Sequence, residues 1–118
     1  MSHHFENLEV WKRACALSVF TYKAVASCQN FTFKDQMTRY SLSIPSNIAE
    51  GSERNSYKEF IRFLYISKSS SAELRTQSYI AQKIKLIAPE QTKHIIEESK
   101  EISAMLQGLI NQLSSRID

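Results

Sequence analysis

The sequence predicts an all-α protein: an antiparallel up-down four-helix bundle, with residues 1–118 forming a single domain. A chain of 118 residues fits one domain and leaves little room for two. Hydrophobic residues make up 42% of the chain, which is enough to form a core. The 2 glycines and 2 prolines are too few for the tight turns of an all-β fold, and they favour long uninterrupted helices.

We expect the first helix to run from about Asn7 to Ser27, because apolar and small residues recur there at spacings of three and four. Thr32 is the expected N-cap of the second helix, with Asp35 three residues later. The expected inner stripe of the first helix consists of Leu8, Trp11, Cys15, Ser18, Tyr22 and Val25, and it is widened by Ala14, Leu17 and Phe20.

The second helix is expected from about Phe33 to Glu50. Pro45 lies inside it and removes one backbone hydrogen bond, so we expect a kink there rather than a break. Gly51 then stands where a left-handed residue would end the helix. The expected inner face consists of Met37, Tyr40, Ser41, Ile44 and Ile48.

The third helix has a clear start signal, because Ser56 and Glu59 form a capping-box pattern. Neither glycine nor proline interrupts the chain from there to Ala88, so this helix is expected to reach about 30 residues. Pro89 suits the first position of a fourth helix, which should fade near Ser114. Short connections between these helices imply antiparallel neighbours.

The third helix is apolar on more than one face. A bundle helix needs one buried face, so a second one predicts contact with another subunit. The alternative is a wide intramolecular face with a few exposed aromatic residues. Small residues at 67–72 would let another helix approach closely. The first stripe contains Phe60, Leu64 and Leu74, and the second contains Phe63, Ile66 and Ile80.

Basic residues are concentrated in the third helix. From Arg54 to Lys85 the chain has seven basic and two acidic residues, and six of the basic ones fall within an arc of roughly 140° at 100° per residue. Such a stripe can attract a phosphate backbone. The predicted nucleic-acid-binding residues are Arg54, Lys58, Arg62, Lys68, Arg75 and Lys83.

Two alternatives accompany this interpretation. The stripe could be balanced by Glu97, Glu98 and Glu101 of the fourth helix, in the same or a neighbouring subunit. Three tyrosines near the same arc could stack on exposed bases, or they could form the rim of a subunit interface. These tyrosines are Tyr57, Tyr65 and Tyr79.

Catalytic and metal sites are not expected. No Glu-x-x-His motif of a di-iron bundle is present, and Cys15 and Cys28 lack the second pair of a zinc site. The two cysteines favour a reduced, cytoplasmic setting. We predict that Asn47, Glu50 and Glu73 form a polar network with Arg39 near Pro45; the alternative, a catalytic carboxylate pair, lacks an accompanying nucleophile or histidine.

The segment Ser43–Gly51 resembles the signature of the four-helix-bundle proteins encoded in intervening sequences of bacterial 23S ribosomal RNA genes. Four further segments resemble the same family in order: Phe5–Trp11, Lys34–Met37, Glu59–Leu64 and Ala72–Gln77. The chain departs from the family pattern at Thr38, where a second basic residue is usual, and at Ser69, where glycine is usual.

This resemblance implies a four-helix bundle that assembles into a ring, a pentamer. It implies that Pro45, Asn47, Glu50, Gly51 and Glu73 are motif residues. A related branch serves as the accessory subunit of retroelement reverse transcriptases and binds nucleic acid through a basic surface; RNA association is suspected for the ribosomal branch.

Together these observations predict a non-enzymatic, oligomeric, cytoplasmic protein that binds RNA or another nucleic acid through the third helix. It should need no cofactor, no metal, no membrane and no small-molecule substrate. The alternative is a ring-forming scaffold or protein-interaction module without a nucleic-acid role.

Overall fold

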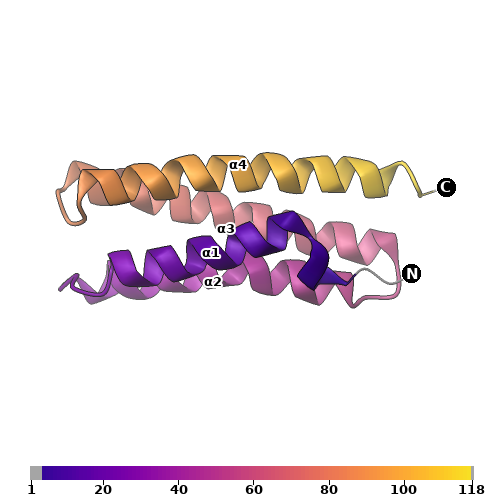
Figure 1. Cartoon of the computed structure of the whole chain (residues 1–118), viewed down its shortest axis with the longest axis horizontal. Coiled ribbons are helices and arrows are strands. Elements are labelled where there is room, and N and C mark those ends of the chain that lie inside the picture. The colour runs from indigo at the N-terminus through magenta and orange to yellow at the C-terminus, as the bar shows by residue number, and fades with distance from the viewer. Residues whose placement is uncertain (1–3, 118) are drawn as a thin grey trace.

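Four helices lie side by side along the long axis of the molecule in the computed structural model, which describes residues 4–117 (Figure 1). Each helix in Figure 1 runs opposite to the one before it, and the molecule measures 49 × 21 × 18 Å. The all-α class is confirmed. The elements are the 3-10 helix η1 (Phe5–Asn7) and the helices α1 (Glu9–Ala24), α2 (Phe31–Ser52), α3 (Tyr57–Lys83) and α4 (Pro89–Ser114).

The helices form a closed ring in cross-section, in which each packs against its chain neighbours and α1 also packs against α4. The packing of α3 on α2 and α4 is more extensive than that of α1 on its two neighbours. The core therefore lies mainly around α3. Its fully buried large side chains include Leu17, Met37, Ile44, Ile48, Phe60, Leu64, Leu74, Ile95, Ile102 and Leu106.

The predicted inner face of α1 is confirmed at Ala14, Leu17 and Val25, which are buried, and it is wrong at Tyr22. Tyr22 is 64% exposed. Trp11 is partly buried and packs edge-to-face on Phe5, with ring centroids 5.2 Å apart. Small side chains let α1 lie close to its neighbours, whereas the large rings are accommodated at its margins. The buried residues of α1 are Val10, Ala14, Leu17, Thr21 and Ala24.

The start of α2 differs from the prediction, because Asn30 is the N-cap in place of Thr32. The Asn30 side chain accepts a hydrogen bond from the backbone N–H of Phe33 at 3.1 Å. Asparagine satisfies a free N–H of the first helical turn as well as threonine does, so local preference does not separate the two. The helix therefore begins at Phe31, two residues before the expected position.

Gly51 is not a left-handed cap: it lies inside α2, and no glycine in the described part of the chain has a positive φ. Its role is close approach between helices. A Cβ atom at this position would lie 2.7 Å from Cβ of Phe63 and 3.2 Å from the carbonyl oxygen of Phe60. Gly51 thus brings the end of α2 into direct contact with the first turns of α3.

The middle of α2 is joined to α3 by serine hydroxyls. α2 continues through the buried Pro45, and the expected kink there stays a prediction. One residue earlier, the carbonyl of Ile44 accepts a hydrogen bond from Ser67 Oγ at 2.9 Å. The hydroxyls of Ser43 and Ser70 lie 2.8 Å apart. These bonds let two backbones approach closely without leaving buried hydroxyls unsatisfied.

The opposite side of α3 meets α4 in the same way. Ser71 Oγ donates to the carbonyl of Ser99 at 2.9 Å, and it accepts a hydrogen bond from Ser103 Oγ at 2.9 Å. Ser71 and Ser99 are both fully buried. The small-residue run in the middle of α3 therefore serves close packing within this chain.

The ends of α3 illustrate one expected and one unexpected cap. Ser56 Oγ accepts a hydrogen bond from the N–H of Glu59 at 3.2 Å, as the capping pattern predicts. The helix ends at Lys83, because Lys85 adopts a left-handed conformation with φ of 57°. The N–H of Leu86 donates a hydrogen bond to the carbonyl of Ala81 at 2.8 Å. This is the bond of a Schellman motif that spans six residues. The predicted extension to Ala88 is therefore too long.

Replacing Gly51 with alanine should destabilise the protein by about 1–3 kcal/mol, because the added methyl group overlaps Cβ of Phe63. Gly108→Ala is the matched control: the added methyl group meets no neighbouring side chain or helix within 4 Å, so the change should stabilise the helix by about 0.5–1 kcal/mol. Urea unfolding followed by circular dichroism measures both. Equal effects of the two substitutions would contradict the close-approach role of Gly51.

Candidate nucleic-acid interface

The second apolar face predicted on α3 is present in part. Phe63 is buried, so its assignment to an outer face is wrong: its Cβ lies against Gly51. Its ring lies beneath two guanidinium groups, with Cζ of Arg54 at 4.8 Å and Cζ of Arg62 at 4.6 Å from the centroid. Ile66 and Ile80 are 37% and 46% exposed. Apolar surface therefore remains on the outside of α3.

The predicted basic stripe is neutralised at the N-terminal end of α3. Arg54 lies in the connection before the helix, and its Nη2 is 3.6 Å from Oε2 of Glu50. Arg62 Nε lies 3.2 Å from Oε2 of Glu59. Lys58 is exposed and has no ion-pair partner among residues 4–117. Of the three predicted cations at this end of the stripe, Lys58 is therefore the one without an ion-pair partner in the described chain.

Two of the remaining predicted cations, Lys68 and Arg75, lie along the border of α3 with α4, and their contacts there are with uncharged groups. Lys68 Nζ donates a hydrogen bond to Oε1 of Gln107 at 2.6 Å, and Arg75 Nη1 donates to Ser103 Oγ at 3.4 Å. Lys83 is exposed at the last turn of α3. No carboxylate of the described chain lies within ion-pair distance of these three residues.

Two acidic residues of α4, Glu98 and Glu101, lie on the side of α1. Arg13 of α1 donates to Glu98 through Nε at 2.7 Å and Nη2 at 3.0 Å, and its Nη1 lies 3.9 Å from Glu101. The hydrogen bond from Arg13 lowers the pKa of Glu98 below its ordinary value. Within the described chain, therefore, Glu98 and Glu101 pair with α1 and do not balance α3, whereas Glu97 forms no ion pair. Balance by the glutamates of a neighbouring subunit stays an alternative.

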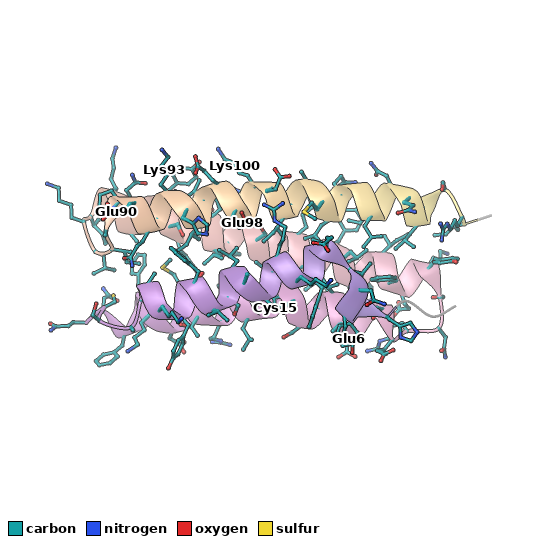
Figure 2. The ribbon with its side chains drawn as sticks, in the orientation of Figure 1. Glu6, Cys15, Glu90, Lys93, Glu98 and Lys100 are labelled. Carbon is teal, nitrogen blue, oxygen red and sulfur yellow. The ribbon has the colours of Figure 1, made fainter. Side chains whose placement is uncertain are left out.

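Two functional candidates on α4 were missed by the sequence analysis, Lys93 and Lys100. Both are exposed, and they lie seven residues apart on a line that continues to Gln107, the contact of Lys68. Figure 2 shows them on the outer side of α4, whereas Glu98 lies on the side of α1. The acidic composition of α4 concealed this spacing. We call Lys68, Arg75, Lys83, Lys93 and Lys100 the basic face.

Charge and aromatic residues next to the basic face define its edges. Glu97 lies within one turn of Lys93 and Lys100 but forms no ion pair within 4.0 Å in the described chain. Tyr79 is 49% exposed and lies four residues from both Arg75 and Lys83, so it shares their side of α3. Tyr65 is exposed three residues before Lys68, whereas Tyr57 is partly buried against the core.

The predicted polar network near Pro45 contains one of its four expected members. Asn47 Nδ2 donates to the carbonyl and to the hydroxyl of Ser43, both at 2.9 Å. Glu50 and Glu73 lie on the surface and outside this network. Arg39 is exposed as well, with Nη1 3.8 Å from Asp35. The three charged residues occupy outward positions of their helices, which keeps their charges hydrated.

Residues that could carry other chemistry are dispersed. Between residues 4 and 117, no group of three histidine, cysteine, aspartate or glutamate side chains is placed to hold a metal ion. Cys15 and Cys28 are free thiols, and burial raises the pKa of Cys15. The His94 ring packs on Phe20 with centroids 4.3 Å apart. None of the described helices has the length and apolar character needed to cross a membrane.

A separate apolar surface lies between α1 and α2. Val19 and Tyr22 of α1 and Leu42 of α2 are each more than half exposed, and they line a shallow hollow of about 380 Å³ together with Ser18 and Thr38. Phe31, which at 78% is the most exposed large apolar side chain among residues 4–117, borders an adjoining hollow. The prediction of Tyr22 as an inner residue concealed this surface from the sequence analysis.

Comparisons with known proteins agree with the fold. A family model described as 23S rRNA-intervening sequence protein matches residues 6–108. A similar solved structure is that of a protein of unknown function from the S23 ribosomal protein family of Bacteroides thetaiotaomicron. It is 27% identical, with a TM-score of 0.80, and the match covers 86% of this chain and 97% of that chain. No curated protein matches the sequence.

Substituting Glu98 with glutamine should lower the free energy of unfolding at pH 7 by about 0.5–1.5 kcal/mol, because the ion pair with the partly exposed Arg13 is lost. A carboxylate whose pKa is lowered by folding stabilises the protein above its unfolded pKa, and this contribution disappears as the pH falls through the folded pKa. The difference between wild type and variant should therefore vanish in acid. Thermal unfolding across pH 3–7 measures it.

Glu97→Gln is the control for this experiment, because Glu97 is exposed on the same helix and forms no ion pair in the described structure. Its effect should stay within about 0.5 kcal/mol at every pH. A loss for Glu98→Gln that is as large at pH 3 as at pH 7 would show that the ion pair does not stabilise the contact of α1 with α4.

Proposed function

This chain belongs to the 23S rRNA-intervening sequence protein family, and we propose that it is a non-enzymatic subunit that binds nucleic acid through its basic face. The observation that carries the proposal is the set of five cations on α3 and α4 without an ion-pair partner in the described chain. Unpaired cations on one face are available to phosphates without first breaking internal ion pairs.

The energetics of phosphate binding support this assignment. Each lysine or arginine that contacts a phosphate releases condensed counterions, so several cations on one surface give an affinity that depends steeply on salt. Tyr65 and Tyr79 add exposed rings next to the cations, where they can contact sugar or bases. The net charge of +3 favours the approach of a polyanion as well.

We also propose that the subunit works as a homo-oligomer, with the pentameric ring implied by the family resemblance. Support comes from the apolar surface between α1 and α2 and from the exposed Ile66 and Ile80 of α3. These two surfaces lie on different helices of the bundle, so contact between them would be head-to-tail, the type of contact that closes into rings. Assembly would repeat the basic face around the ring.

Nucleic-acid binding is tested with an RNA hairpin that contains both a stem and a loop, titrated by fluorescence anisotropy. Affinity should fall steeply between about 50 and 200 mM salt, with a log–log slope of roughly −3 to −4.5 for four or five phosphate contacts. Substituting Lys83, Lys93 and Lys100 together with glutamine should flatten the slope by about 2 to 3, because three phosphate contacts are lost.

Lys12→Gln combined with Lys23→Gln is the control, because both lysines are exposed on α1, away from the basic face. This variant should retain most of the affinity of wild type. Absence of binding at low salt, or equal losses for the two variants, contradicts the proposal and leaves the scaffold function as the alternative.

Assembly is tested by sedimentation at micromolar concentration. Wild type should sediment as an oligomer, and Leu42→Glu should shift it to lower mass, because a charge is placed in the apolar hollow. Gln112→Glu, at an exposed position near the end of α4, should leave the mass unchanged. A wild-type protein that sediments as a stable monomer rules out the homo-oligomer.

A further inference from the structure

Three exposed residues, Ile66, Glu73 and Ile80, lie in a line along the outer side of α3. They follow each other at intervals of seven residues, which keeps them on one side of the helix with a drift of about 20° per interval. Glu73 has no ion-pair partner among residues 4–117. We call these residues the α3 ridge, because two apolar side chains stand on either side of a free carboxylate.

The apolar surface between α1 and α2 is one continuous groove. Its two hollows, of about 380 and 440 Å³, share Tyr22 and Thr38. Leu42 lines one hollow, and Phe31 and Lys34 line the other. The groove therefore follows α2 from Leu42 to Phe31, a distance of roughly 16 Å at 1.5 Å per residue. We call it the α1–α2 groove.

The free charge in the groove is opposite to that on the ridge. Asp35 lines the groove, but its carboxylate pairs with Arg39, whose Nη1 lies 3.8 Å away. Lys34 Nζ donates a hydrogen bond to the carbonyl of Ala26 at 3.2 Å, and no carboxylate of the described chain lies within ion-pair distance of it. The groove thus offers an unneutralised cation to the unneutralised carboxylate of Glu73.

The order of side chains along the two surfaces agrees when the two helices run in opposite directions. In a ring whose subunits all point the same way, α3 of one copy runs antiparallel to α2 of the next, as α3 and α2 do within one subunit (Figure 1). With Glu73 placed at Lys34, Ile66 lies about 10 Å away on the side of Leu42, which is itself about 12 Å from Lys34. Ile80 then lies toward the opposite end of the groove.

Contact between two identical surfaces is disfavoured by the same charges. Two grooves that face each other bring Lys34 of both copies into one interface, and two ridges bring both Glu73 carboxylates together. Like charges across an interface repel, and the cost rises when the contact excludes water. A ridge seated in a groove instead gives each of these charges a partner of opposite sign.

We propose that the α3 ridge of one copy packs into the α1–α2 groove of the next copy, where Glu73 of one pairs with Lys34 of the other; this inference rests on the proposed homo-oligomer. Each subunit then uses one ridge and one groove, so the contact is head-to-tail, as ring closure requires. Glu73 lies about 140–160° around α3 from Lys68 and Arg75 at 100° per residue, so the contact leaves these two cations of the basic face uncovered.

A mixing experiment tests this pairing, with Leu42→Glu as the groove variant and Ile80→Glu as the ridge variant. Both side chains are exposed, so circular dichroism should show an intact fold for each variant. Each variant alone should sediment as a monomer at micromolar concentration, because no copy in the sample can seat an intact ridge in an intact groove. An equimolar mixture should form a 1:1 dimer that grows no further, because it contains one usable ridge and one usable groove per pair.

Gln112→Glu is the control, because it places a charge at an exposed position of α4, and it should assemble as wild type does. If Ile80→Glu assembles as wild type does, or if the mixture stays monomeric while wild type assembles, the pairing of ridge with groove is overturned and the homo-oligomer stands. A monomeric wild type refutes the homo-oligomer itself and leaves the groove to a different protein.

Charge reversal tests the ion pair by a second route. Glu73→Lys and Lys34→Glu should each raise the dissociation constant of the oligomer roughly tenfold or more, because two like charges then meet in the contact. The double variant restores opposite charges and should recover most of the wild-type affinity, a coupling that independent surface positions do not show. A double variant that loses as much affinity as the two single variants combined overturns the pairing of these two residues.

Discussion

The close contact of α3 with both neighbouring helices is the constraint on which the rest of this structure depends. Buried serines make it: Ser67 and Ser70 hydrogen-bond to α2, and Ser71 hydrogen-bonds to α4. Short side chains let the backbones approach, and their hydroxyls find carbonyl or hydroxyl partners in the dry interface. Because α3 is held at this distance from α4, Lys68 and Arg75 reach Gln107 and Ser103. The core contacts therefore position the basic face.

Local signals predicted the parts of the fold that local energetics decide. The hydrophobic period, the Ser56 cap and Pro89 at the start of α4 each act within one or two turns, so a sequence reveals them. Gly51 shows what such local signals cannot predict. Its position after an apolar run is typical of a helix end, but its function is set by Phe63, twelve residues away. The left-handed conformation at Lys85 could not be predicted, because glycine, the usual residue at such a position, is absent there.

The candidate site could be predicted on α3 and not on α4, for a physical reason. Counting charges along a segment averages over the faces of a helix, and two of the acidic residues of α4 lie on another face than its lysines. Glu98 and Glu101 meet Arg13, whereas Lys93 and Lys100 lie outside. For the same reason, the count of basic residues treated Arg54 and Arg62 as free cations. In the structure Arg54 pairs with Glu50, and Arg62 pairs with Glu59. An ion pair between residues within one or two helical turns cancels positive charge that a count of basic residues still includes.

The cations of the basic face have no ion-pair partner in the described chain, whereas Glu98 and Glu101 are neutralised by Arg13 on the side of α1. This uneven distribution of positive charge gives the subunit an electric dipole moment across its width. A nearby polyanion would exert a torque on that dipole before any atoms touch, turning the basic face toward the polyanion. More of the diffusional encounters would then begin in a productive orientation. The charge separation would thus act on the association rate, while the lifetime of a complex would depend on the contacts made after docking.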